Sequence, residues 1–409
     1  MSYYSQYMKR LYENLIHQHL TELRQMAFLM GPRQVGKTTL SLEVAKKWPE
    51  YFYFNWDNPA ERLLFIEGPS AIASQVNLDE IKQEIPILIF DEIHKFGKWK
   101  TFLKGFFDKY EKETKMIVTG SARLNVYKKG GDSLMGRYFY YRIHPLSVAE
   151  IVAPHIIENE IRTDPKPISD EDWNALLEFG GFPEPFVQRS KSFSKRLQAM
   201  RKDQLFSEDI RDATRIQEIA QLQLLAELLQ KQAARSLDFQ SLAKKVRVST
   251  DTIRRWIEVL KSFYFCFSIQ PWSKNITRSL LKEPKLYLWD WSLVEDVGQR
   301  NENFIANHLL KAIHFWNDRG MGDYGLYYLR TKEQKEVDFV VTKNNKPWFL
   351  VEAKTKKNSI SRDLYRFQNE TKAPHAFQVT LDLPFVSKNC FEETKPIIVP
   401  ARTFLSQLV

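Results

Sequence analysis

The stretch Gly31-Pro32-Arg33-Gln34-Val35-Gly36-Lys37-Thr38 decides the fold of the N-terminal part of the chain. It follows the apolar run Met26–Met30, which predicts a buried strand, and precedes residues 39–47, which predict a helix. The spacing G-x-x-x-x-G-K-[ST] is that of a phosphate-binding loop. Its glycines let successive backbone N–H groups point at one anion, which the helix dipole also attracts. A plain glycine turn is the alternative, and the flanking strand and helix favour the loop.

The loop predicts a nucleotide site with a divalent cation. Lys37 would reach the β- and γ-phosphates, and the hydroxyl of Thr38 would ligate Mg²⁺. ATP and Mg²⁺ are the expected ligands. The residues expected to bind the nucleotide are Gly31, Pro32, Arg33, Gln34, Val35, Gly36, Lys37, Thr38 and Thr39.

Length and composition set the broad class. At 409 residues the chain exceeds one compact domain, and its 43% hydrophobic content is ample for packed cores. Cys266 and Cys390 cannot form a disulfide framework and have no metal-site spacing, which fits a reducing cytoplasm. We expect neither a cleavable leader nor a membrane span. The net charge of +10 is compatible with a polyanionic partner but does not establish one.

Apolar runs and helical segments alternate up to about residue 150. This alternation predicts a mostly parallel, three-layered sheet. The expected strands are Met26–Met30, Tyr51–Asn55, Ile87–Phe90, Met116–Thr119 and Tyr138–Ile143.

Two acidic residues directly follow the expected apolar strand Ile87–Phe90. Asp91 and Glu92 should therefore lie at the carboxyl edge of the sheet, where open α/β sheets bind ligands. Asp91 suits the Mg²⁺ shell, and Glu92 suits polarisation of an attacking water. A solvated turn is the alternative, and the phosphate-binding loop on the same sheet disfavours it.

Hydroxyls and arginines near the next strands are further candidates. Thr119 and Ser121 could sense a γ-phosphate or orient the water, or they could simply cap the strand end. Arg123 and Arg137 could neutralise charge in a transition state, as arginine fingers do. An ordinary surface position is the alternative for both arginines.

Residues 237–267 have the pattern of a helix-turn-helix. Residues 250–260 predict its second helix, which Ser249 is placed to cap. In DNA readers such a helix enters the major groove, whereas the same module elsewhere serves as a spacer between proteins. The candidate DNA contacts are Lys244, Lys245, Arg254 and Arg255.

The last third of the chain holds a second group of charged residues. Residues 335–341 and 348–354 predict two strands joined by a turn. Residues two apart in a strand face the same way, so Glu352 and Lys354 point together and Asp338 can meet them. With Glu302 on a preceding helix they suggest an Mg²⁺ site for phosphodiester cleavage. Charge alternation on a half-exposed hairpin is the alternative.

With these motifs in view, the chain resembles a large bacterial and archaeal family whose members are usually called ATP-binding proteins. The matching stretches are GPRQVGKTTL from Gly31, IFDEIHK from Ile89, VTGSA from Val118, SLMGR from Ser133, GGFPEP from Gly180, EVDFVV from Glu336 and VEAKT from Val351.

The resemblance implies an AAA-like P-loop ATPase of the additional-catalytic-glutamate division, joined to a winged helix and a restriction-endonuclease-like domain of the PD-(D/E)XK type. It implies that Lys37 and Thr38 bind nucleotide and Mg²⁺, that Asp91 holds the metal and that Glu92 is the catalytic acid. It also maps Asp338, Glu352 and Lys354 onto the nuclease-fold motif, although a shared fold does not show cleavage.

We therefore expect an α/β protein in four parts. Residues 1–150 would form the P-loop ATPase domain with its parallel sheet, and residues 151–231 a helical linker or lid. Residues 232–285 would form a winged-helix-like module, and residues 286–409 a small restriction-endonuclease-like α/β domain.

The sequence leaves three alternative functions open. The first is a cytoplasmic Mg²⁺-dependent ATPase that acts on DNA. The second is an ATP-dependent switch that binds a protein, a nucleic acid or a second copy of the chain, with incidental turnover. The third is an ATP-gated DNA nuclease that uses the C-terminal carboxylates.

Overall fold

The computed structural model describes residues 8–120, 134–211, 214, 216–273, 283–331, 333 and 335–409. Ser121 and Arg123, both candidates from the sequence, lie outside the described residues. The chain divides between His144 and Pro145 into two compact units. No helix in the described part of the chain combines the length and the apolar character needed to cross a membrane.

The N-terminal unit contains a five-stranded sheet in the order β2-β3-β4-β1-β5, and all its pairings are parallel. All five predicted strands are present. Its elements are α1 (Tyr12–Glu22), β1 (Met26–Met30), α2 (Lys37–Ala45), β2 (Tyr51–Asn55), α3 (Pro59–Glu67), α4 (Pro69–Gln75), β3 (Ile87–Asp91), the short η1 (Ile93–Lys95), α5 (Trp99–Tyr110), β4 (Lys115–Gly120) and β5 (Tyr138–Arg142).

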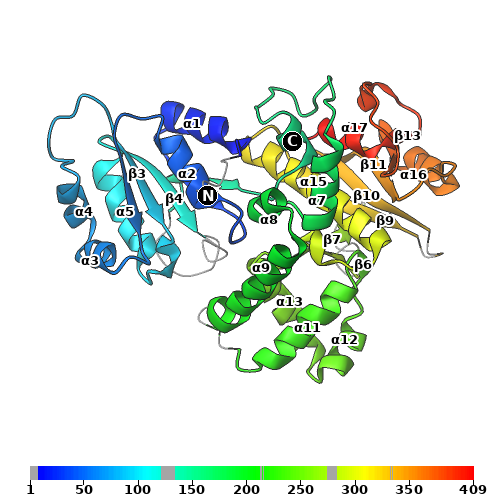
Figure 1. The fold of residues 1–409 in the computed structure, drawn as a ribbon, viewed down its shortest axis with the longest axis horizontal. Coiled ribbons are helices and arrows are strands. Elements are labelled where there is room, and N and C mark those ends of the chain that lie inside the picture. Colours follow the sequence, from blue (N-terminus) through cyan, green and yellow to red (C-terminus); the bar gives the residue numbers. More distant parts are fainter. Residues whose placement is uncertain are drawn as a thin grey trace. The chain divides into compact units, whose positions relative to one another are not determined.

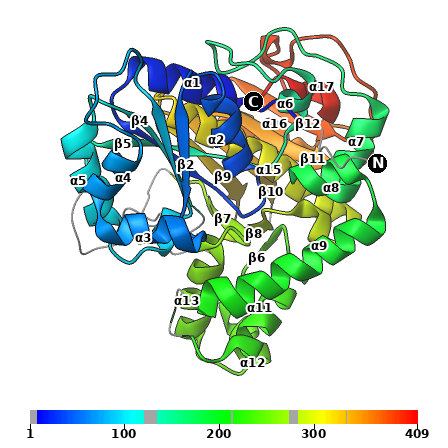
Figure 2. The same ribbon diagram turned by 60° about the vertical axis from the view of Figure 1, so that its left-hand side comes forward.

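Helices cover both faces of this sheet, with α2 on one side and α5 on the other (Figures 1 and 2). Helix α5 buries an aromatic stripe at helical spacing that includes Phe102 and Phe106. These rings contact Phe90 of β3, which in turn lies beside Phe54 and Phe65. Strand β3 is therefore fixed by hydrophobic packing, and its parallel pairing with β2 and β4 keeps their carboxyl ends at a common edge.

The C-terminal unit begins with helices. They are α6 (Val148–Val152), α7 (Asp170–Phe179), α8 (Pro183–Gln188), α9 (Lys191–Gln204), the π-helical turn η2 (Leu205–Ile210) and α11 (Ile219–Lys231). Next come the short strand β6 (Arg235–Ser236), α12 (Phe239–Val246) and α13 (Thr250–Ser262). Ser249 caps α13 by accepting a hydrogen bond from the amide of Thr252 at 3.1 Å, as the sequence predicted.

One eight-stranded sheet runs through the C-terminal unit in the order β13-β12-β11-β10-β9-β7-β8-β6. Its remaining elements are β7 (Cys266–Pro271), β8 (Lys285–Leu288), η3 (Trp291–Leu293), α15 (Val297–Asp318), β9 (Tyr324–Arg330), β10 (Glu336–Lys343), β11 (Lys346–Lys354), α16 (Arg362–Thr371), β12 (His375–Thr380), η4 (Cys390–Glu392), β13 (Ile397–Pro400) and α17 (Ala401–Ser406). The predicted hairpin is β10–β11, and its turn residues Asn344 and Asn345 have φ of 51° and 63°. Because β7 pairs with β9, the strands that follow α12 and α13 in the chain join the C-terminal strands.

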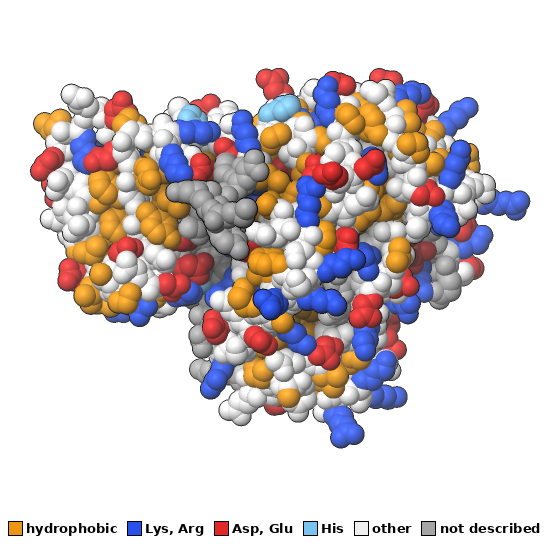
Figure 3. All heavy atoms as spheres, in the orientation of Figure 1, with side chains coloured by type: hydrophobic (Ala, Val, Ile, Leu, Met, Phe, Trp, Pro, Cys, Tyr) orange, Lys and Arg blue, Asp and Glu red, His pale blue; other side chains and the backbone are white. Residues whose placement is uncertain are grey.

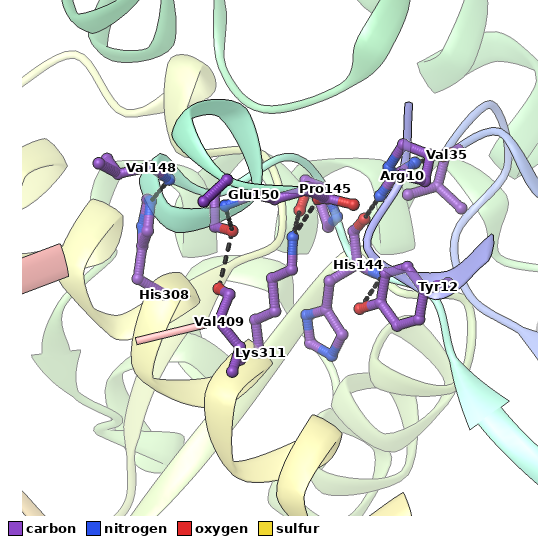
Figure 4. A network of polar contacts seen from close by, with 12 residues as sticks. Arg10, Tyr12, Val35, His144, Pro145, Val148, Glu150, His308, Lys311 and Val409 are labelled. Carbon is purple, nitrogen blue, oxygen red and sulfur yellow. Dashed lines mark hydrogen bonds and ion pairs between the residues drawn. The ribbon is translucent and has the colours of Figure 1, made fainter. Parts of the chain in front are cut away.

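Helix α15 carries a buried polar network on the side that faces α6 (Figure 4). Lys311 forms an ion pair with Glu150 and donates to the carbonyl of Pro145 at 3.0 Å. One turn earlier, Nε2 of His308 accepts from the amide of Val148 at 3.1 Å, while its Nδ1 lies 2.8 Å from the carbonyl of Phe304. These partners require a neutral imidazole with its proton on Nδ1.

We predict that His308 makes the C-terminal unit acid-sensitive. Burial lowers the pKa of His308 from 6.5 to about 3, and the Phe304 hydrogen bond only partly opposes this. The unfolded chain takes up this proton below pH 6.5, so the stability contribution is complete above that pH and falls until about pH 3. The total loss is roughly 5 kcal/mol.

Urea unfolding of the full chain between pH 7 and pH 4 checks this prediction. His308→Gln, whose amide oxygen can accept from Val148 without titrating, should have a shallower dependence on pH. Equal slopes for the two proteins would contradict the prediction.

Candidate functional site

The phosphate-binding loop joins β1 to α2, as predicted. Gly36 has a φ of 95°, a left-handed conformation that glycine adopts without strain, and α2 begins at the next residue. The ammonium of Lys37 donates to the carbonyls of Gly31 at 3.0 Å and Pro32 at 2.8 Å, so this side chain folds back over the loop. A Cβ atom at Gly31 would collide with the carbonyl of Ile143, which requires glycine there.

A buried arginine, Arg10, contacts the backbone of the phosphate-binding loop (Figure 4). Nη1 of Arg10 donates to the carbonyl of Val35 at 2.8 Å, and Nη2 donates to the carbonyl of His144 at 2.7 Å. Arg10 is 3% exposed, and its amide donates to Glu13 at 2.8 Å. No local sequence signal indicates this role, because Arg10 lies well before the motif and holds the loop through backbone oxygens.

The carboxylate of Asp91 gathers three hydroxyl donors at the carboxyl edge of the sheet. Thr38 donates to Oδ2 at 2.9 Å, and Thr119 of β4 donates to Oδ1. Tyr53 of β2 also donates to Oδ2, at 2.6 Å. Burial and this hydrogen bond raise the pKa of Tyr53 above its ordinary value, so the hydroxyl keeps its proton. Three of the predicted site residues, Thr38, Asp91 and Thr119, thus lie together, whereas Tyr53 was not among the predicted residues.

Glu92 follows Asp91 in a left-handed backbone conformation, with φ of 54° and ψ of 20°. Its Oε2 lies 3.5 Å from the ammonium of Lys95 and 3.7 Å from Nε2 of His94. Lys95 also donates to Asp57 at 2.5 Å. Glu92, the predicted catalytic acid, therefore lies beside Lys95 and His94 in the turn that follows β3.

Arg137 lies at the opposite edge of the sheet. It directly precedes β5, whose first residue pairs with Met26 at the start of β1, whereas the phosphate-binding loop follows the end of β1. Its guanidinium binds both carboxylate oxygens of Asp108, at 2.6 and 2.9 Å. Among the described residues, the structure does not bring Arg137 to Lys37, Glu92 or Thr119.

Oxygen ligands suited to Mg²⁺ are present beside the loop. The hydroxyl of Thr38 and the carboxylate of Asp91 are in direct contact, and hard oxygen ligands are what Mg²⁺ prefers. Asp91 is 3% exposed and, within the described residues, its side-chain donors are uncharged hydroxyls. The residues present therefore fit a magnesium–nucleotide complex.

The four predicted nuclease residues lie in the C-terminal unit with partners of their own. Lys354 contacts Glu352 at 2.8 Å, and Ser361 donates to the other oxygen of Glu352 at 2.6 Å. Asp338 accepts from the amide of Ala353 at 2.8 Å. Glu302 accepts from Lys285 and Tyr287, neither of which was predicted.

The predicted DNA contacts lie on α12 and α13, and all are exposed: Lys244, Lys245, Arg254 and Arg255. The guanidinium of Arg254 lies 4.0 Å from the centre of the Phe239 ring. On the face drawn in Figure 3, lysine and arginine side chains project near α11 and α12, with acidic side chains between them. This part of the unit is basic in places and mixed in charge overall.

Three family models match parts of the chain. Residues 23–152 match the model of an AAA domain. Residues 170–303 and 297–386 match two domains of unknown function, DUF8612 and DUF4143. The chain carries an AAA-like domain. It comprises the parallel sheet, the phosphate-binding loop and Asp91.

Relatives extend over most of the chain. An uncharacterized protein of Methanocaldococcus jannaschii is 23% identical over 392 residues, covering 89% of this chain and 83% of that protein. An uncharacterized protein of Mycobacterium tuberculosis is 24% identical over 352 residues, covering 83% and 72%.

Similar solved structures include a Walker-type ATPase of Pyrococcus abyssi, with a TM-score of 0.43, 14% identity and coverage of 70% of this chain and 94% of that chain. DnaA of Aquifex aeolicus bound to AMPPCP has a TM-score of 0.33 and 14% identity, and the coverage is 62% and 88%.

We predict that Arg10 sets the local stability of the phosphate-binding loop. Arg10→Met leaves two buried carbonyls without their donors, which costs about 2 kcal/mol or more. Amides of residues 26–45 in the full chain should then exchange hydrogen about 30-fold faster, as measured by mass spectrometry. Lys9→Ala, at the neighbouring exposed residue, is the control and should leave the exchange rates unchanged. Unchanged exchange rates in Arg10→Met would contradict the prediction.

Proposed function

We propose that this protein binds ATP with Mg²⁺ and hydrolyses it, and that its basic helices contact DNA. The observation that carries the ATPase part is the convergence of Thr38, Asp91 and Thr119 at the mouth of the phosphate-binding loop. These side chains come from α2, β3 and β4, and only a folded parallel sheet brings them together.

Each residue has a role that its surroundings support. Backbone amides of the loop and the start of α2 would hold the phosphates, and Lys37 would turn from the loop carbonyls to the γ-phosphate. Thr38 and Asp91 would hold Mg²⁺, which offsets negative charge on the phosphates. Glu92 would orient the attacking water and accept its proton, while Thr119 would keep Asp91 in place.

The DNA part of the proposal is supported by the order of elements in the C-terminal unit. Helix α11, strand β6, helices α12 and α13 and the antiparallel pair β7–β8 follow one another as in a winged helix. The exposed basic residues lie on α12 and α13. Protein recognition by the same helices is the rival, and DNA is favoured because these side chains are cationic.

We predict that substitutions in the N-terminal unit separate binding from turnover. Lys37→Ala should abolish ATP binding in calorimetry. Glu92→Gln should keep the ATP affinity but lower phosphate release by at least about 100-fold, because it removes the general base. The exposed Glu113→Gln is the matched control and should have normal turnover. Full activity of Glu92→Gln would contradict the assigned role.

We also predict salt-sensitive DNA binding through α12 and α13. The triple variant Lys244→Ala, Lys245→Ala, Arg255→Ala should weaken binding and lower the slope of log K against log salt by about 2 to 3. A charge-matched control on α9 combines Lys191→Ala, Lys195→Ala and Arg196→Ala and should change binding little. Equal losses in both variants would assign the effect to net charge and reject the proposed surface.

A further inference from the structure

A buried lysine lies at the centre of the carboxylate cluster in the C-terminal unit. The ammonium of Lys285, the first residue of β8, is 3.0 Å from Oε1 of Glu302 on α15. It also contacts Glu336 directly and lies 3.7 Å from Oδ1 of Asp338, both on β10. Lys285 is 4% exposed, so its ammonium is enclosed among these three carboxylates.

These carboxylates also have other partners within the chain. Tyr287 donates to the Glu302 oxygen that Lys285 contacts, at 2.8 Å. The amide of Ala353 takes the second oxygen of Asp338, and Arg330 lies 3.7 Å from the second oxygen of Glu336. Glu352, the remaining predicted ligand, is turned to Lys354 and Ser361.

This arrangement does not fit a divalent metal. Across the parts of the chain that are described, no group of three or more His, Cys, Asp and Glu side chains is placed to hold a metal ion. A metal bound to Glu302 and Asp338 would lie a few ångströms from the ammonium, where two like charges repel strongly in a buried site. Burial lowers the pKa of Lys285, but Glu302, Asp338 and Glu336 outweigh it and raise that pKa above its ordinary value, so Lys285 stays charged.

We infer that Lys285 is the resident cation of this cluster, which therefore acts as an internal brace and not as a metal-dependent nuclease centre. Strand β8 belongs to the strands that follow the helix-turn-helix, whereas β10 belongs to the C-terminal half of the sheet and α15 is a helix that precedes β10 in the chain. The ammonium links these elements. The cluster thereby fixes the helix-turn-helix region to the rest of the unit, a role independent of ATP hydrolysis.

The test measures Mn²⁺ binding by electron paramagnetic resonance. It uses the full, nucleotide-free chain carrying Asp91→Asn, which removes the carboxylate beside the phosphate-binding loop. With Lys285 present we expect no Mn²⁺ site at millimolar metal. Adding Lys285→Met should raise Mn²⁺ affinity about tenfold or more, because the nearby like charge is gone. Adding Glu302→Gln as well should abolish the gain.

Lys354→Met is the matched control, because it removes the other lysine near these carboxylates and should create no site. Two results would overturn the inference. One is Mn²⁺ binding by the chain with Lys285 intact that disappears in Asp338→Asn. The other is a Lys285→Met chain that is folded by circular dichroism and gains no affinity. The comparison between the chain with Lys285 intact and its Asp338→Asn variant does not change Lys285. It therefore tests the inference even if Lys285→Met does not fold.

Discussion

The hydrogen bonds to the carboxylate of Asp91 are the interaction on which the N-terminal unit depends. Thr38, Tyr53 and Thr119 come from three different elements, and all donate to one buried side chain. This convergence requires β2, β3 and β4 to end at the same edge, which their parallel pairing ensures. The hydrophobic contacts of α5 with β3 keep that edge in register, so the aromatic core positions the polar site.

The sequence predicted the elements of this site because their signals are local. The glycine spacing of the loop and the apolar run before Asp91 can both be recognised without tertiary information. Tyr53 was missed because nothing in residues 51–55 distinguishes it from Tyr51, and only the pairing of β2 with β3 directs its hydroxyl to Asp91. Arg10 was missed for a similar reason, since its partners are backbone carbonyls that are distant in sequence.

The position of Arg137 could have been predicted from strand direction. In a parallel sheet, a residue directly before a strand lies at the amino edge, and the phosphate-binding loop lies at the carboxyl edge. The two edges of a five-residue strand are on the order of 13 Å apart. In the C-terminal unit, the alternation of side chains along a strand correctly predicted that Glu352 and Lys354 point the same way. This alternation could not identify Lys285, because the lysine that contacts Glu302 lies on β8, outside the predicted hairpin.

The carboxylate of Asp91 and the cluster of Glu302, Glu336 and Asp338 differ in how their charge is balanced. The described side-chain donors to Asp91 are neutral hydroxyls, which orient its oxygens but leave its negative charge available to a cation. The cluster of Glu302, Glu336 and Asp338 already contains an ammonium, which orients these carboxylates and offsets part of their negative charge. A buried carboxylate attracts an external cation only while its charge is uncompensated. Acidic residues at motif spacing therefore indicate a metal site only when their nearest donors are uncharged, and in this chain that condition favours Asp91.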